Sequence, residues 1–134
     1  MVIGIYDTKT LREIEMEVAE FYPFLKIEFF SEPYEENEIL PGKKQFPINR
    51  TIGEVKTTTT GQHLEITAGL STAALEKAFM QLFGLTARTF RLEGDDWKLI
   101  PLNSMLTLEE QNECGKKITE KKQVLSEKRK MENW

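Results

Sequence analysis

The stretch STAALEKAFMQLFGLTARTFRL, residues 71–92, decides the fold of this chain. Ser71 or Thr72 is suited to begin a helix, because its hydroxyl accepts a hydrogen bond from a free backbone N–H group. Gly84 suits the left-handed conformation that ends a helix. The Thr- and Phe-rich residues 86–92 that follow predict a strand. Between cap and stop, apolar residues recur at the spacing of one helix face: Leu75, Ala78, Phe79, Leu82 and Phe83.

A second helix and strand with the same layout come earlier in the chain. Thr10 and Glu13 have the spacing of a capping box, in which each side chain satisfies a free N–H at the helix start. Pro23 ends this helix, and residues 24–30 (FLKIEFF) predict a strand. At an offset of 61 positions, the apolar positions of this unit match those of the first. An internal duplication is therefore a hypothesis that the sequence alone does not prove.

Each helix–strand unit follows a short β-prone run, at residues 2–6 and 63–68. The resulting order, β-α-β-β-α-β, predicts an α+β fold of the ferredoxin-like type. Residues 97–102 are expected to add an edge strand. Thr51 and Glu54 repeat the capping-box spacing, and a third capping box at Thr107 begins a C-terminal helix. A ubiquitin-like β-grasp is the second architecture, because a helix start such as that in residues 51–55 (TIGEV) also suits it.

The predicted organisation is one α+β domain over residues 1–106, with a long loop at residues 31–61, and a basic helix or tail over residues 107–134. Gly115 is expected to interrupt the last helix, since glycine weakens a helix interior. Beyond it the chain is rich in Lys and Glu and has few residues for a core.

The formal net charge of −4 conceals an uneven distribution. Residues 1–42 hold ten acids and three bases, a net −7, whereas residues 116–130 hold seven bases and two acids, a net +5. Such blocks concern partner choice rather than fold. The single cysteine, Cys114, and the lack of a long apolar run or basic leader predict a cytoplasmic protein without a membrane partner.

The residues that carry common catalytic chemistry are scarce. The chain has one His and one Cys, which predicts neither a metal site, nor a cofactor, nor a catalytic residue. An alternative function, a small-ligand or anion binder or an enzyme, would use Arg50, the run Thr57–Thr60 and His63, together with the backbone N–H groups at the Thr51 helix start. The full candidate anion site is Lys43, Lys44, Arg50 and His63.

Nucleic acid is not expected as the ligand of the domain body. A ferredoxin-like outline invites comparison with the RNA-recognition motif, which stacks bases on aromatic residues of its sheet. The corresponding strand, residues 63–69 (HLEITAG), has no aromatic residue, Lys or Arg. The acidic domain also opposes phosphate binding. The basic tail is the one segment for which weak nucleic-acid binding stays a hypothesis.

Two surfaces are candidates for binding another protein. If Ala87 and Thr89 face inward, Phe90 is exposed on the open sheet face beside Trp97 and forms an apolar patch. The alternative to such a patch is that Phe90 lies at an edge and is partly covered by Trp97. If instead Phe90 and Leu92 face the helices, Arg88 shares their side and is near the strand end or paired with an acid. Self-association of the last helix would use Ile118 and Leu125.

Several segments together resemble a small uncharacterised bacterial protein family. They are TLREI with FYPFLKIEFF, INRTIGEV, and LEKAFMQLFGLTARTFRL followed by a Trp and LTLEEQN. The resemblance covers roughly residues 8–115 and implies a free-standing cytoplasmic domain with no assigned activity. The sequence as a whole therefore favours a non-catalytic protein-interaction module, whose partner is another protein or a second copy of the chain.

Overall fold

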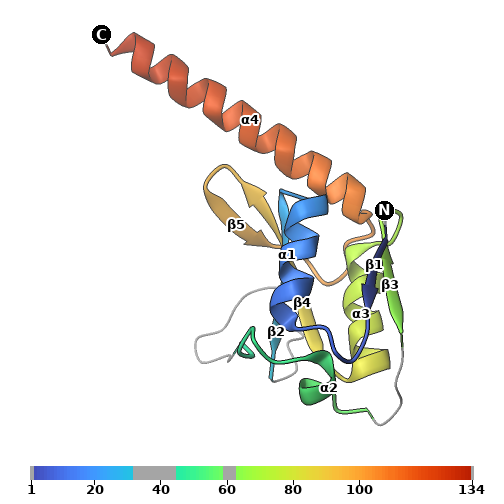
Figure 1. Cartoon of the computed structure of the whole chain (residues 1–134). Coiled ribbons are helices and arrows are strands. Elements are labelled where there is room, and N and C mark those ends of the chain that lie inside the picture. The colour runs from blue at the N-terminus through green and yellow to red at the C-terminus, as the bar shows by residue number, and fades with distance from the viewer. Residues whose placement is uncertain (1, 32–44, 59–62, 134) are drawn as a thin grey trace.

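The computed structural model describes residues 2–31, 45–58 and 63–133 (Figure 1). Among these residues the strands form two antiparallel sheets, β1–β3 and β2–β4–β5. The elements follow one another as β1 (Val2–Ile5), α1 (Leu11–Phe21), β2 (Leu25–Phe30), α2 (Ile52–Val55), β3 (Leu64–Thr67), α3 (Thr72–Phe83), β4 (Thr86–Glu93), β5 (Asp96–Leu99) and α4 (Leu108–Glu132). The predicted α+β class and C-terminal helix are confirmed.

The strand pairing differs from the ferredoxin-like arrangement. A split β-α-β unit would place β3 between β1 and β2. Among the described strands β3 pairs with β1 alone, and β2 pairs with β4. The order of elements along the chain does not decide which strands share hydrogen bonds, so this finer prediction is not confirmed. The β-grasp alternative gains no support from these pairings either.

The helix starts follow the predicted capping chemistry. Thr10, Thr51 and Thr107 each accept a hydrogen bond from the N–H three residues later, and the Glu at that position completes the capping box. Ser71 caps α3 by accepting from the Ala74 N–H. At the other end of α3, Gly84 has a φ of 64°, and its N–H bonds back into the helix. The unit that was expected to decide the fold therefore forms as its sequence predicts.

The two halves of the structure repeat one layout. β1-α1-β2-α2 is followed by β3-α3-β4-β5-α4, so that only β5 is inserted into the second half. Strands in equivalent positions pair with each other, β1 with β3 and β2 with β4. Within each half the two helix starts are joined by an isolated bridge, Thr10 to Thr51 and Ser71 to Thr107. The likeness seen at an offset of 61 positions thus extends to the whole topology.

The helix starts of each half also cap each other through the backbone. The N–H of Leu11 donates to the Arg50 carbonyl, and the N–H of Ile52 donates to the Lys9 carbonyl, both at 2.9 Å. In the second half the N–H of Leu108 donates to the Leu70 carbonyl at 2.9 Å. These bonds satisfy N–H groups that a helix leaves without an internal partner. In this arrangement α4 occupies the position that α2 occupies in the first half.

One core joins the helices and both sheets. One face of β2 is fully buried, with Leu25, Ile27 and Phe29 each at most 1% exposed. Phe29 packs edge-on against Phe79 of α3, with the ring centroids 5.1 Å apart. The other buried side chains of this core come from both halves of the chain: Ile3, Ile5, Leu11, Ile14, Val18, Tyr22, Ile52, Val55, Ile66, Leu75, Phe83, Leu85, Ala87, Ile100 and Leu108.

Helix α4 does not break at Gly115, contrary to the prediction. The helix is continuous from Leu108 to Glu132. At Gly115 the helix lies so close to the sheet that a Cβ atom would be 2.9 Å from the Leu92 carbonyl oxygen and 2.9 Å from Cβ of Phe24. Glycine is therefore used here for close helix–sheet approach, and the packing offsets its weak helix propensity of about 1 kcal/mol.

Candidate functional site

Helix α4 is the element that distinguishes the two halves. Its counterpart α2 has 4 residues, whereas α4 has 25. The first turns of α4 are anchored: Leu108 is buried, and the Asn112 Oδ1 accepts from the Phe24 N–H at 2.8 Å. Figure 1 shows the far end of α4 running away from the rest of the described chain.

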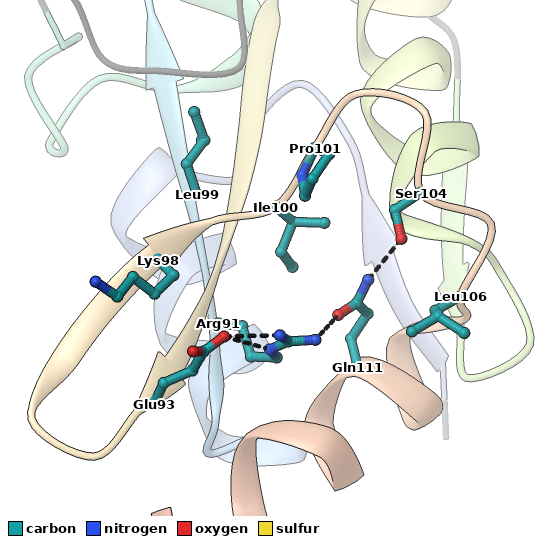
Figure 2. A pocket seen from close by; sticks show the side chains of 9 residues that line it. All are labelled: Arg91, Glu93, Lys98, Leu99, Ile100, Pro101, Ser104, Leu106 and Gln111. Atoms are coloured by element: carbon teal, nitrogen blue, oxygen red, sulfur yellow. Dashed lines mark hydrogen bonds and ion pairs between the residues drawn. The ribbon is translucent and has the colours of Figure 1, made fainter. Parts of the chain in front are cut away.

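A polar network holds α4 to the β4–β5 hairpin (Figure 2). The Arg91 Nη2 and Nε donate to the Glu93 Oε2 at 2.7 and 3.0 Å, and its Nη1 donates to the Gln111 Oε1 at 2.9 Å. The Gln111 Nε2 in turn donates to the Ser104 Oγ at 2.8 Å. Gln111 is buried, so the network fixes the base of α4 in one orientation.

This network lines a small pocket of about 100 Å³. That volume is well below the roughly 300 Å³ at which pockets for drug-sized ligands begin. The guanidinium of Arg91 is already neutralised by Glu93, which removes the charge that an anion would need. We therefore read the pocket as part of the anchor of α4. The other residues that line it are Lys98, Leu99, Ile100, Pro101 and Leu106.

The last contacts of α4 with the domain are at the hairpin turn. The Gly94 N–H donates to the Thr119 Oγ1 at 3.0 Å, and the Lys122 Nζ donates to the Glu93 carbonyl at 3.0 Å. From Glu120 to Asn133 every residue is exposed. We call residues 120–133 the arm. Its larger apolar side chains are open to solvent: Val124 is 62% exposed, Leu125 49% and Met131 76%.

The two residues predicted for self-association differ in exposure. Ile118 is half-buried at the base of α4, and Leu125 is exposed on the arm. Ile118 is partly covered, so it is not part of the exposed apolar surface of the arm. That surface consists of Val124, Leu125 and Met131. All seven bases between Lys116 and Lys130 are exposed.

The expectation of an exposed Phe90 on the sheet face is wrong. Phe90 is only 3% exposed, although Ala87 and Thr89 are also buried. Both faces of β4 are covered at this point, which the alternation of the sequence does not reveal. The Lys26 Nζ lies 5.2 Å from the centroid of the Phe90 ring and 5.0 Å from that of Trp97. Trp97, at 39% exposed, is the part of the predicted patch that is accessible.

Glu15 of α1 has an unusual environment beside this lysine. The pKa of its carboxyl is raised from 4.5 to about 7, chiefly by burial and also by the charge of Glu28, while the charge of Lys26 lowers it. The group is neutral in part of the folded population near pH 7. The carboxyl is half-buried on a helix, so its charged form carries an electrostatic cost to folding.

We expect the variant Glu15→Gln to be more stable than the native chain at pH 8 and equally stable at pH 4. The folded pKa lies above the unfolded one, so stability is complete below pH 4.5 and is lost as the pH rises through about 7. With allowance for solvent screening the gain at pH 8 is about 1 kcal/mol. Urea unfolding at both pH values measures it. Glu65→Gln, an exposed change on β3, is the control, and an equal gain in both variants would contradict the assignment to Glu15.

Of the predicted anion site, the structure describes Arg50 and His63, and each has other neighbours. Arg50 forms an ion pair with Glu54, with 3.4 Å between the Arg50 Nε and the Glu54 Oε2, and His63 is exposed beside Gly4 of β1. Lys43, Lys44, Thr59 and Thr60 lie outside the described residues. The two described threonines serve α3: the Thr57 Oγ1 donates to the Gly84 carbonyl and the Thr58 Oγ1 to the Leu82 carbonyl.

The backbone donors expected to help hold an anion are also occupied. At the start of α2 the Gly53 N–H donates to the Asp7 carbonyl at 2.9 Å, and the Glu54 N–H donates to the Thr51 Oγ1 at 3.2 Å. The Ile52 N–H is taken by the backbone of α1, as described above. The sequence predicts this helix start. It does not show that other parts of the chain already accept the hydrogen bonds of its N–H groups.

Among residues 2–31, 45–58 and 63–133, no three His, Cys, Asp or Glu side chains are grouped so that they would hold a metal ion. No helix in the same part of the chain is long and apolar enough to cross a membrane. No family model, curated protein or solved structure matches the chain. The resemblance to a bacterial family accordingly gains no support from these comparisons.

The residues that anchor α4 were missed by sequence reasoning. Arg91, Gln111 and Ser104 lie on three elements, and no spacing along the chain brings them together. One signal was present: Arg91 and Glu93 are two positions apart in a strand, so their side chains share a face. The exposure of the arm, in contrast, follows from its poor supply of apolar residues, which the sequence showed.

Proposed function

We propose that this chain is a protein-interaction module that binds its partner through the arm, residues 120–133. The observation that carries the proposal is the difference between α2 and α4. One helical turn suffices to complete the first half, whereas the second half continues for about 20 residues past the equivalent point. The fold does not need these residues, so they are available for binding.

The arm is a helix without a buried face of its own. Helices with polar residues all round bridge between molecules, are held by many side-chain pairs, or are unstable alone. Isolated helices shorter than about 12 to 15 residues are marginal in water. The arm is helical because it extends a helix whose base is fixed by Gln111, Asn112 and Thr119. A rigid base and an open end are well suited to present a helix to a partner.

The charge of the arm region indicates the kind of partner. Residues 116–130 carry a net +5, and all of their bases are exposed. Exposed like charges attract an acidic surface over a distance of about 10 Å at 0.1 M salt. They increase the rate of association and contribute to specificity. We therefore expect a partner with an acidic surface that also accepts the apolar side chains Val124, Leu125 and Met131.

A chain that ends at Gln123 tests this proposal. It keeps Thr119 and Lys122 and their contacts with the hairpin, so its free energy of unfolding should stay within about 0.5 kcal/mol of the full chain. Denaturant unfolding measures this. Affinity capture from the native cells, with both chains immobilised, should give partners that only the full chain retains. The full-length variant Ser126→Ala is the control and should retain the same partners.

Either of two results would contradict the proposal. If the shortened chain captures the same partners as the full chain, binding occurs elsewhere on the domain. If shortening lowers the free energy of unfolding by several kcal/mol, the arm is part of the folded core and not an available surface.

A further inference from the structure

We propose that the partner of the arm is a second copy of this chain. The arm of one copy lies along the exposed acidic face of α1 in the other copy. The inference rests on the proposed function of the arm and names its partner. In a twofold dimer each arm would contact the α1 of the other copy, so that two equivalent contacts form.

Helix α1 presents a surface that complements the arm. Its sequence, LREIEMEVAEF, has four acids and one base. A shallow, open hollow along the helix is lined by Glu13, Met16, Glu17, Ala19 and Glu20, and Met16 at its centre is 60% exposed. This face thus has an apolar centre within an acidic surround, which matches an arm with apolar residues within a basic surround.

The position of the acids on α1 strengthens the negative potential. The last turn of α1 has no basic residue, and Glu20 lies at this end. The C-terminus of a helix carries a partial negative charge, so an acid there is unfavourable unless a cation is near. Glu17 already pairs with Lys9, at 2.6 Å between the Lys9 Nζ and the Glu17 Oε2. Glu20 is exposed, and a base from another molecule has free access to it.

The arm cannot reach α1 of its own molecule. The start of α4 is tied next to the end of α1 by the bond from the Phe24 N–H to Asn112, and α4 is continuous from there. The arm consequently leads away from the domain (Figure 1). Pairing of two arms with each other is also disfavoured, because it would bring together two segments of like charge, each with five bases and three acids. The acidic helix of a second molecule avoids both difficulties.

The dimensions allow such a contact. At about 1.5 Å per residue, α1 with 11 residues is about 16 Å long and the arm with 14 residues about 21 Å. One short helix crossing buries a small area, but the twofold repeat doubles it. We expect the total to be near the lower end of stable interfaces, about 1,200 Å². The dimer should accordingly be of micromolar affinity and weakened by salt.

Analytical ultracentrifugation of the full chain at about 1 to 200 µM, in about 0.05 and 0.5 M salt, tests the inference. We expect a monomer–dimer equilibrium whose dissociation constant rises roughly tenfold or more at the higher salt. The arm variant Lys128→Glu/Arg129→Glu/Lys130→Glu and the α1 variant Met16→Lys/Glu20→Lys should each be monomeric. An equimolar mixture of the two should dimerise again, because the charges then complement each other. Lys77→Glu, an exposed change on α3, is the control and should leave the dimer intact.

Hydrogen exchange locates the contact in the same samples. Protection of residues 11–21 and 120–133 should increase with the concentration of the full chain, and circular dichroism should show every variant folded. The inference is overturned if the full chain is monomeric throughout, or if both reversed variants still dimerise. A monomer whose arm captures a different acidic protein would leave the proposed function standing. Arm-dependent binding of a single-stranded RNA oligonucleotide by a monomeric chain would overturn this inference and replace the proposed protein partner.

Discussion

Replacing Glu76 with leucine is expected to lower the free energy of unfolding by about 3 to 5 kcal/mol. Glu76 of α3 is 8% exposed, and its Oε1 lies 3.2 Å from the Nε of Arg88, which is 1% exposed. The Glu76 Oε2 also accepts from the Thr89 N–H at 2.9 Å and from the Thr89 Oγ1 at 2.7 Å. Leucine would remove the carboxylate beside a buried guanidinium and would take away the acceptor of the Thr89 N–H and hydroxyl. Denaturant unfolding at pH 7 measures the loss.

The size of this effect depends on burial and not on the mere presence of an ion pair. Burial raises the pKa of Glu76, whereas its bonds with Thr89 and the charge of Arg88 lower it. Glu120→Leu on the exposed arm is the matched control and should change the free energy by less than about 0.5 kcal/mol. The double variant Glu76→Leu/Arg88→Met should lose less than the sum of the single losses. A loss below 1 kcal/mol for Glu76→Leu alone would show that the pair is open to solvent.

Gly84→Ala is expected to cost about 2 to 4 kcal/mol, from two separate causes. The first is conformational, because Gly84 has a φ of 64° at the end of α3, where a side chain is strained. The second is steric, because an added Cβ would lie 1.7 Å from the Thr57 Oγ1. The Thr57 hydroxyl donates to the Gly84 carbonyl at 3.2 Å, and the Thr57 N–H donates to the Phe83 carbonyl at 2.8 Å. Thermal and denaturant unfolding both report the loss.

A second background separates the two causes. Thr57→Ala removes the oxygen that the new Cβ would meet, so Gly84→Ala should cost less in that background, with about 1 to 2 kcal/mol of strain left. Gly69→Ala is the control glycine, since no atom lies within 4 Å of the position of its added Cβ. It should be neutral or slightly stabilising. Equal costs for Gly84→Ala in both backgrounds would show that Thr57 moves aside freely.

The candidate site illustrates where sequence reasoning stops. The exposure and charge of the arm were apparent from the composition of residues 116–130, because too few apolar residues occur there to cover a helix. The burial of Phe90 was not apparent, because the alternation of β4 predicts one covered face and the structure covers both. The anchor of α4 joins Arg91 to residues from other elements. Contacts of this kind have no recognisable pattern of spacing in the sequence.

The sequence by itself determined the local elements of this protein. Caps at Thr10, Thr51, Ser71 and Thr107, the stop at Gly84 and the apolar periodicity specify where helices and strands form, because each acts within a few residues. The tertiary structure alone decided that β2 pairs with β4, that Gly115 packs against the sheet inside an unbroken helix, and that the start of α2 is already filled. The physical reason is that these outcomes depend on contacts between segments that are far apart in the sequence. Gly115 is one such case, because a helix continues through a glycine where packing requires close approach.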